Sequence, residues 1–302
     1  MIGQAAFGKD VLNALVEKNE DVVAALCPPD REGRPADPVK EAAETHGISV
    51  YQYSRMRDSK AIEEFLSLNI DLCVMAFVTD IVPMEILEAP TYGTIQYHPS
   101  LLPEHRGPSS INWPIIEGKN KTGLTIFWPD EGLDTGPILL QKETKIEPDD
   151  TLGSVYFGRL YPMGIEAMVE AVNMVKSGNA SKLQQDHSKA TYQGWCRAGD
   201  AVIDWEDTAP NIYNMIRGCD PSPGANTILG SDKISFFKAS FSQTVSEAIP
   251  GTVIGIDDDS FSLAAKGGII SIGRVQLNRD PKLMAGEFVE TGAIQVGKRF
   301  GV

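Results

Sequence analysis

Short apolar runs alternate with helical patterns over the first 180 residues, and this alternation constrains the fold more than any other feature. VVAALC (22–27) follows a helical stretch and is stopped by two prolines, and IDLCVMAFV (70–78) is a second, strongly apolar run. Strands that alternate with helices form parallel sheets with right-handed crossovers. Further strands are expected at 48–52, 93–99, 122–130 and 136–147, and helices at 39–47, 60–69, 83–89, 109–118 and 151–177.

The start of the chain departs from this pattern. A sheet of this kind usually opens with an apolar strand, yet only Met1 and Ile2 precede the turn-like stretch 3–8, so the first strand is nearly absent. Either the start codon is misplaced or the fold tolerates a stub. Gly3 and Gly8 have the spacing of a phosphate loop, but the Lys-Ser/Thr that completes such a loop is missing, which argues against a nucleotide site.

The second half of the chain has a different character. The polar stretch 177–194 has no hydrophobic period, as is usual in a linker between domains. After a helix at 208–218, short alternating runs separated by Gly and Asp turns suggest a small antiparallel barrel. The sequence therefore predicts a parallel-sheet α/β domain at 1–180, a linker at 181–195 and a β-barrel domain at 196–302.

Charge and cysteine content argue against several classes of protein. The 27 Lys and Arg residues against 41 Asp and Glu residues give a net charge of -14, which repels polyphosphates, so nucleic-acid binding is not expected. Cys27, Cys73, Cys196 and Cys219 lack C-x-x-C spacing, and Asp257 to Asp259 fit an acidic hairpin turn, so no metal site is expected. The chain has neither an apolar membrane-spanning run nor a secretory signal, and we expect a cytoplasmic protein.

Three polar residues mark the best candidate site. Gln96 and His98 are two apart on one expected strand, so their side chains leave the same face, and Asp134 lies in the loop after the next strand. An imidazole and a carboxylate can form an acid/base pair, and an amide can donate to a developing oxyanion. By spacing alone, His98 either takes part in catalysis or only caps the strand. Nearby, His105 and Arg106 are expected to be solvated or to face a substrate.

Two longer stretches carry a resemblance to a known family. YHPSLLPEHRGPSSINWPIIEG (97–118) followed by GLTIFWPDEGLDTGPILLQK (123–142) resembles the formyltransferases that use 10-formyltetrahydrofolate. The resemblance is closest to the hydrolase domain of 10-formyltetrahydrofolate dehydrogenase and more distant to methionyl-tRNA formyltransferase. It implies a Rossmann-like N-terminal domain and an OB-like barrel. It also implies that His98 and Asp134 are the catalytic pair, in a reaction without a metal.

The resemblance also implies where the substrates bind. The folate is expected against the loop around Phe77 to Pro83 and the backbone of Asp130 to Gly132, and the acceptor near the loop 105–107. The folate-binding candidates are Phe77, Ile81, Pro83, Leu101, Asp130, Glu131 and Gly132, and the acceptor-side candidates are His105, Arg106 and Gly107. Many family members that transfer formyl to an amine have Asn where this chain has Gln96, which places the amide donor one methylene further out.

The expected function is formyl transfer from 10-formyltetrahydrofolate to water or a small amine, which releases tetrahydrofolate. Formylation of charged tRNA is an alternative that the barrel domain favours and the acidic charge opposes. An amino-sugar acceptor would require a nucleotide pocket that the sequence does not indicate. A non-catalytic folate-binding protein is a further alternative, although it would have no need of a paired acid and base at positions 98 and 134.

Overall fold

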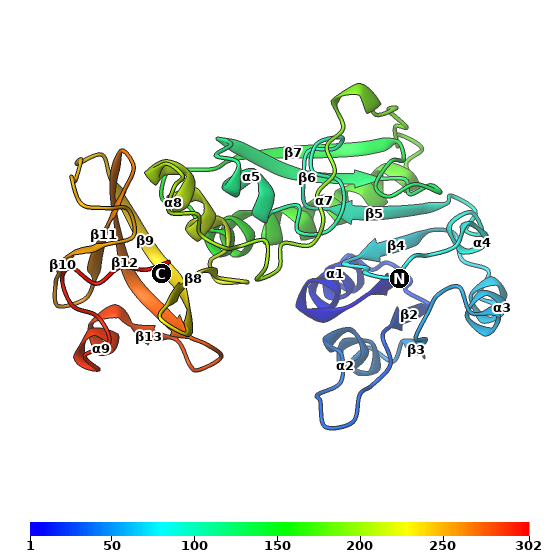
Figure 1. Ribbon diagram of the computed structural model, residues 1–302. Helices are drawn as coiled ribbons and strands as arrows, with labels where there is room; N and C mark the ends of the chain where they lie inside the picture. The colour runs from blue at the N-terminus through cyan, green and yellow to red at the C-terminus, as the bar shows by residue number, and fades with distance from the viewer. Residues whose placement is uncertain (302) are drawn as a thin grey trace. The chain divides into compact units, whose positions relative to one another are not determined.

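The computed structural model describes residues 1–301, which form two compact units (Figure 1). Unit 1 consists of Met1–Gly107, Gly123–Thr144 and Arg159–Tyr192. Unit 2 consists of Pro108–Thr122, Lys145–Gly158 and the chain from Gln193 onward. Each unit is thus assembled from several segments, and the contiguous domain boundaries expected at 180 and 195 stay a prediction. No helix within residues 1–301 is long and apolar enough to cross a membrane.

Unit 1 is built on a seven-stranded sheet in the order β3-β2-β1-β4-β5-β6-β7. Pairing is parallel from β3 through β5, which confirms the predicted α/β class. The strands are β1 (Ile2–Gly3), β2 (Ala24–Cys27), β3 (Ser49–Gln52), β4 (Cys73–Ala76), β5 (Thr94–His98), β6 (Lys121–Phe127) and β7 (Ile138–Lys145). The helices are α1 (Ala5–Glu17), α2 (Pro38–Thr45), α3 (Ser59–Ser67), α4 (Met84–Leu87) and α7 (Tyr161–Lys176).

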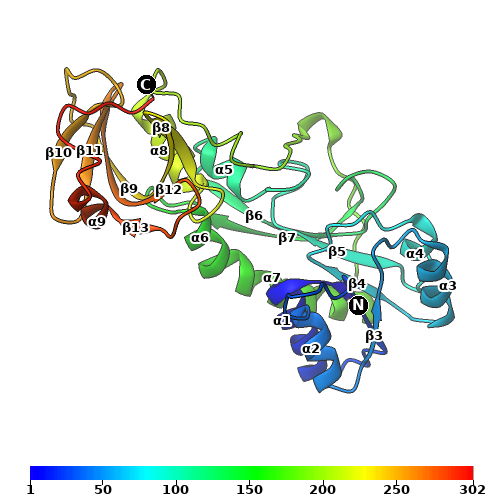
Figure 2. The same cartoon turned by 60° about the horizontal axis from the view of Figure 1, so that its bottom comes forward.

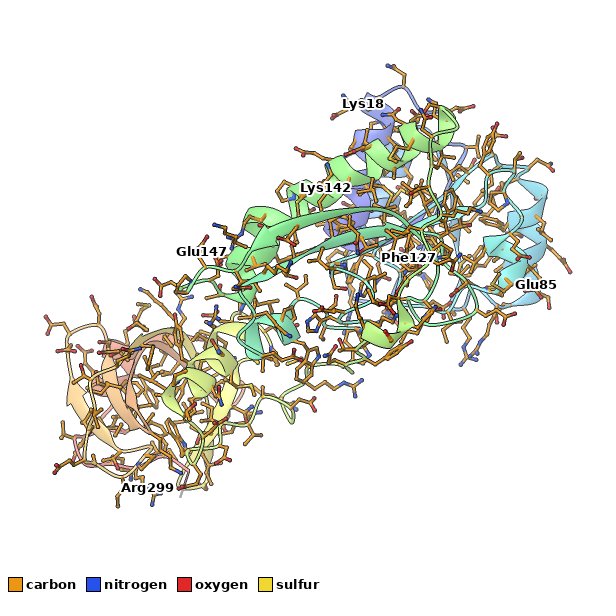
Figure 3. The ribbon with its side chains drawn as sticks, turned by 90° about the horizontal axis from the view of Figure 1, so that it is seen from above. Lys18, Glu85, Phe127, Lys142, Glu147 and Arg299 are labelled. Carbon is orange, nitrogen blue, oxygen red and sulfur yellow. The ribbon has the colours of Figure 1, made fainter. Side chains whose placement is uncertain are left out.

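Helices cover both faces of this sheet. Alternate residues of β2 and β4 point to opposite faces: Ala25 and Val74 pack in the core beneath α1, α2 and α7, whereas Leu26 and Met75 pack with α3 and α4. Figure 2 shows α1 and α2 lying together. On the same side Lys142 of β7 reaches the carboxylate of Glu170 on α7 at 2.6 Å (Figure 3).

The N-terminal strand is a stub of two residues, as the sequence indicated, and it pairs with both β2 and β4. The stretch 3–8 is not a turn, because α1 already begins at Ala5. Its glycines allow close packing: a Cβ on Gly3 would lie 2.8 Å from the carbonyl oxygen of Ala76, and one on Gly8 would lie 2.8 Å from Val39. Close approach of the backbone therefore accounts for this pair of glycines without a phosphate ligand.

One expected crossover is wrong. β6 pairs antiparallel with β5, with His98 opposite Thr125, so the chain between these strands does not form a right-handed β-α-β unit. The helix expected at 109–118 is only α5 (Asn112–Ile116), and it packs on a helix of unit 2 instead of on the sheet. A crossover helix must lie on its sheet to return the chain in the parallel sense, and this one does not.

Unit 2 is centred on an antiparallel sheet in the order β10-β11-β12-β9-β8, with β13 paired to β12. This confirms the predicted antiparallel second domain, and the short β13 and α9 were not predicted. The strands are β8 (Ala225–Leu229), β9 (Asp232–Ser242), β10 (Val253–Ile256), β11 (Phe261–Ala265), β12 (Gly268–Leu277) and β13 (Leu283–Met284). The helices are α8 (Ala209–Gly218) and α9 (Ala285–Glu290), with α5 beside α8 and Phe236, Phe261 and Phe300 in the core.

The long helix expected at 151–177 is interrupted. It consists of α6 (Leu152–Val155), a π-helical turn (Tyr156–Leu160) and α7, and Thr151 caps its start through a hydrogen bond from the Ser154 amide. The polar segment that follows lies along unit 1, since Leu183 and Ile138 exchange two backbone hydrogen bonds of 2.8 and 2.9 Å. This attachment places the following residues, 185–192, beside the polar residues at the end of β5.

Candidate active site

Strand β5 presents two polar side chains on one face. Ile95 and Tyr97 point into the core beneath α1 and α7, so Gln96 and His98 point to the other face. His98 is the last residue of the strand and its side chain is 8% exposed. Gln96 is half-buried and, among residues 1–301, its amide group has no hydrogen-bond partner. The two side chains therefore share one face of the strand, as the sequence predicted.

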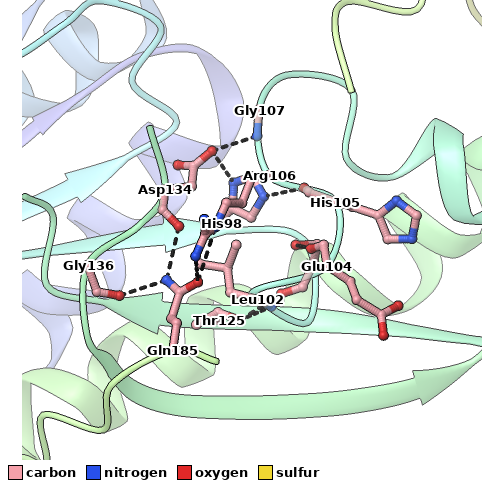
Figure 4. A network of polar contacts seen from close by, with 11 residues as sticks. His98, Leu102, Glu104, His105, Arg106, Gly107, Thr125, Asp134, Gly136 and Gln185 are labelled. Carbon is pink, nitrogen blue, oxygen red and sulfur yellow. Dashed lines mark hydrogen bonds and ion pairs between the residues drawn. The ribbon is translucent and has the colours of Figure 1, made fainter. Parts of the chain in front are cut away.

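The imidazole of His98 lies between a backbone carbonyl and a carboxylate (Figure 4). Its Nε2 is 2.9 Å from the carbonyl oxygen of His105, and its Nδ1 is 3.6 Å from Oδ2 of Asp134. A carbonyl can only accept, so Nε2 donates this hydrogen bond and Nδ1 is the ring nitrogen that faces the carboxylate. That separation is longer than a hydrogen bond.

Asp134 is held firmly although it lies in a loop. Oδ2 accepts a 2.8 Å hydrogen bond from the Gly107 amide, and its side chain is 8% exposed. The loop is closed at its base by a hydrogen bond from the Trp128 amide to the Pro137 carbonyl. Asp134 itself has φ +56°, a left-handed conformation that costs a non-glycine residue about 1–2 kcal/mol and must be held by its surroundings.

The loop that follows His98 is also fixed by hydrogen bonds. The Thr125 hydroxyl donates to the Ser100 carbonyl and accepts from the Leu102 amide, while Gln141 donates to the Leu102 carbonyl. Thr125 is the β6 residue paired with His98, so the antiparallel strand serves as a support for the loop. A rigid loop keeps the carbonyl of His105 against Nε2 of the imidazole and the amide of Gly107 against the Asp134 carboxylate.

His105 and Arg106 are not solvated, so of the two expectations for them only a position facing a substrate stays a prediction. His105 and Arg106 are 5% and 2% exposed, and Gly107 is also buried. The Arg106 guanidinium donates to Oε1 of Gln185 through Nε at 3.2 Å and through Nη2 at 2.6 Å, and to the Tyr192 hydroxyl at 2.6 Å. Arg106 is therefore internal to the site, and an acceptor-side role for this loop stays a prediction.

The folate candidates fall into two groups. Phe77 and Ile81 are 46% and 76% exposed, and Leu133 beside Asp134 is 58% exposed although the sequence did not suggest it. Exposed apolar groups of this kind are suited to a flat ring. Glu131 and Gly132 are exposed as well.

The remaining folate candidates have structural roles. Asp130 accepts hydrogen bonds from the Gly132 amide and the Thr135 hydroxyl and so shapes its own loop. Leu101 packs on Gly123, where an added Cβ would lie 2.5 Å from its side chain. Pro83 precedes α4 and is half-buried. Contact of these residues with a folate stays a prediction.

Two concave regions lie away from the histidine–aspartate pair. A cavity of about 450 Å³ in unit 2 is lined in part by Trp205, Lys233 and Arg299, and an open groove of about 550 Å³ runs between α1 and α7. Neither region includes a residue of the candidate site. This site is therefore identified by its acid and base side chains and not by a cavity. Residues 1–301 contain no group of three or more His, Cys, Asp or Glu side chains placed to hold a metal ion.

Comparison with known proteins identifies the family. Residues 1–172 match the formyl transferase family model, and residues 197–292 match the model of the formyl transferase C-terminal domain. The chain belongs to the formyl transferase family. Both matches together cover most of the chain and agree with the two architectures described above.

The names of similar proteins give different activities. The human cytosolic 10-formyltetrahydrofolate dehydrogenase is 43% identical over 79% of this chain, and the methionyl-tRNA formyltransferase of Geotalea daltonii is 35% identical over 99% of this chain and 97% of its own length. This chain spans about 27–33% of the length of the dehydrogenases it matches. The solved N-formyltransferase of Helicobacter canadensis, in complex with folinic acid and dTDP-3-aminofucose, covers 91% of this chain and 98% of its own with a TM-score of 0.69, and at 17% identity it shows the shared fold.

Proposed function

We propose that this enzyme removes the formyl group from N10 of 10-formyltetrahydrofolate and passes it to water or a small amine. The observation that carries the proposal is the buried pair of His98 and Asp134, with Nδ1 and Oδ2 3.6 Å apart. The 43% identity to a 10-formyltetrahydrofolate dehydrogenase supports the folate as the donor.

The reaction needs a proton acceptor first and a proton donor later. Attack of water on the formyl carbon forms a carbon–oxygen bond and pushes the carbonyl electrons onto oxygen, which gives a tetrahedral oxyanion. Nδ1 of His98 takes the proton of the attacking water, and the Asp134 carboxylate 3.6 Å away stabilises the imidazolium that forms. The imidazolium then returns a proton to N10 as the bond from carbon to N10 breaks, which yields formate and tetrahydrofolate.

The oxyanion requires donors that are already in place. The imidazolium supplies a positive charge beside it, and the Gln96 amide, which has no partner within residues 1–301, is free to donate from the same strand face. The hydrogen bond from Nε2 to the His105 carbonyl fixes the ring, so the imidazole does not have to reorganise during the reaction. The exposed side chains of Phe77 and Ile81 are proposed to hold the pteridine ring.

Incubation of the purified protein with 10-formyltetrahydrofolate alone tests the proposal. We expect tetrahydrofolate and formate to appear in equal amounts, and we expect His98→Ala to reduce turnover by several orders of magnitude. His46→Ala is the matched control, since His46 is exposed on the end of α2. Turnover by His98→Ala at a rate near that of the wild type would disprove the site assignment.

Formylation of methionyl-tRNA is the second candidate. Its support is the Geotalea daltonii enzyme, which matches this chain over nearly the full length of both. The net charge of -14 opposes it, because each phosphate contact on a tRNA needs a cation. If the folate binds but is not turned over, charged initiator tRNA and then amino sugars are the next acceptors to add, and a rate that rises only with the tRNA would favour this candidate.

A further inference from the structure

The segment that follows α7 contributes a side chain to the back of the site. Gln185 is 5% exposed, although its neighbours at 183, 184 and 186 are all exposed. Its Nε2 donates to the carbonyl oxygens of Asp134 at 3.0 Å and Gly136 at 2.7 Å, and its Oε1 accepts from Arg106 (Figure 4). One amide thus connects the loop after β6 to the loop after β5.

The amide can occupy this position in only one orientation. Two carbonyl oxygens face Nε2, and two N–H groups of Arg106 face Oε1. A rotated amide would place oxygen against two carbonyls and nitrogen against the guanidinium, which loses all four contacts. Gln185 is therefore a specific connector and not a surface polar residue that happened to be covered.

Both ends of this connection hold atoms that contact the catalytic pair. At one end lies Asp134, whose left-handed backbone is held through its own carbonyl and that of Gly136. At the other end Arg106 precedes Gly107, whose amide donates to the Asp134 carboxylate, and the Arg106 amide donates to the Thr191 carbonyl at 2.9 Å. The separation of Asp134 from His98 is set by these two loops.

We propose that Gln185 is a positioning residue, which holds the Asp134 carboxylate at its working distance from His98 by fixing the two loops to each other. The inference rests on the proposed function only in so far as Asp134 serves the reaction. It makes no assumption about the acceptor, since Gln185 contacts only backbone carbonyls and Arg106. An error of about 1 Å in the position of a catalytic group can reduce a rate roughly a hundredfold.

The substitution Gln185→Glu separates positioning from folding. A carboxylate at 185 still accepts from both N–H groups of Arg106, and a charged acceptor makes these hydrogen bonds stronger than the present amide does. The variant should therefore fold. Its second oxygen would face the two carbonyls in place of a donor, so the turn at 134–136 loses its support. Gln184→Glu adds the same charge at the exposed neighbouring position and is the matched control.

We expect the substitution to lower kcat and to leave KM and Tm nearly unchanged. For Gln185→Glu we expect kcat with 10-formyltetrahydrofolate to fall by roughly 10- to 100-fold, while KM for the folate stays within about twofold and Tm within about 2 °C. Gln184→Glu should match the wild type in all three. A role confined to stability would lower Tm and leave kcat per folded molecule unchanged, and that result would overturn the inference.

Two further outcomes keep the inference testable. If Gln185→Glu does not fold, Gln185→Met keeps the length of the side chain without its donor, and wild-type kcat in this folded variant would also overturn the inference. If the wild type itself turns over no 10-formyltetrahydrofolate with any acceptor, the proposed function fails, and the positioning role fails with it because Asp134 then serves no reaction. Turnover by the wild type with equal turnover by Gln185→Glu refutes only the positioning role.

Discussion

Replacing Asp134 by asparagine should measure how much the carboxylate contributes to the reaction. Asparagine keeps the shape of the side chain and an oxygen that can accept from the Gly107 amide, so the loop should be preserved. What is lost is the negative charge 3.6 Å from Nδ1 of His98. At an effective dielectric constant of about 20, two unit charges at that distance interact by about 4 to 5 kcal/mol. Loss of this stabilisation of an imidazolium corresponds to a roughly thousandfold lower kcat.

The assay is single-turnover release of tetrahydrofolate, with enzyme in excess over 10-formyltetrahydrofolate, followed beside a measurement of folate affinity. We expect Asp134→Asn to bind the folate within about threefold of the wild type and to release product about a thousand times more slowly. Glu104→Gln removes an equal charge from the exposed side chain of the loop after β5 and should leave the rate unchanged. A rate for Asp134→Asn within about tenfold of the wild type would refute the electrostatic reasoning.

Three further predictions concern the surroundings of the site and the thiols. Gly136→Ala should destabilise the enzyme by more than about 2 kcal/mol and lower Tm by about 5 °C in a thermal melt, because its Cβ would lie 1.7 Å from the Trp128 carbonyl; an unchanged Tm would contradict the close approach. Ile81→Ala should raise KM for the folate about tenfold at constant Tm, since this side chain is 76% exposed; an unchanged KM would remove Ile81 from the folate site. Burial raises the pKa of the Cys27 thiol to about 11, so at pH 8 native protein should react with a thiol reagent at this position at least about a hundredfold more slowly than unfolded protein, as mass spectrometry of the labelled peptides would show; equal rates would contradict the burial.

The sequence predicted the class of fold because its apolar runs are short, buried and separated by helices of regular period. It also predicted the face shared by Gln96 and His98, because side chains on a strand alternate by geometry alone. The antiparallel direction of β6 was missed, since the direction of a strand depends on where the preceding helix packs, and Asn112 of α5 is bonded to the Gly218 carbonyl of α8.

The buried hydrogen bonds that hold the site in place could not be predicted from residue types. Arg106 next to a histidine and a glycine in a proline-rich loop has the sequence signature of a solvated cation, and only the path of the chain near Gln185 shows that its side chain is buried. Gln185 lies in a polar segment without any period, so nothing in its neighbours distinguishes it from Gln184. Contacts between residues far apart in sequence have no local signal.

The segment around Gln185 is bonded to the site, and this determines where the N-terminal part of such an enzyme can be joined to another protein. The family model of the N-terminal domain ends at residue 172, before Gln185, His187 and Tyr192. A chimaera joined at that point would inherit the histidine and the aspartate, but its Arg106 would depend on whatever acceptors the new partner sequence supplied. A junction placed after Tyr192 carries the supporting segment with the residues that it supports. The last segment needed to support the site therefore ends at residue 192, about twenty residues beyond the family boundary at 172.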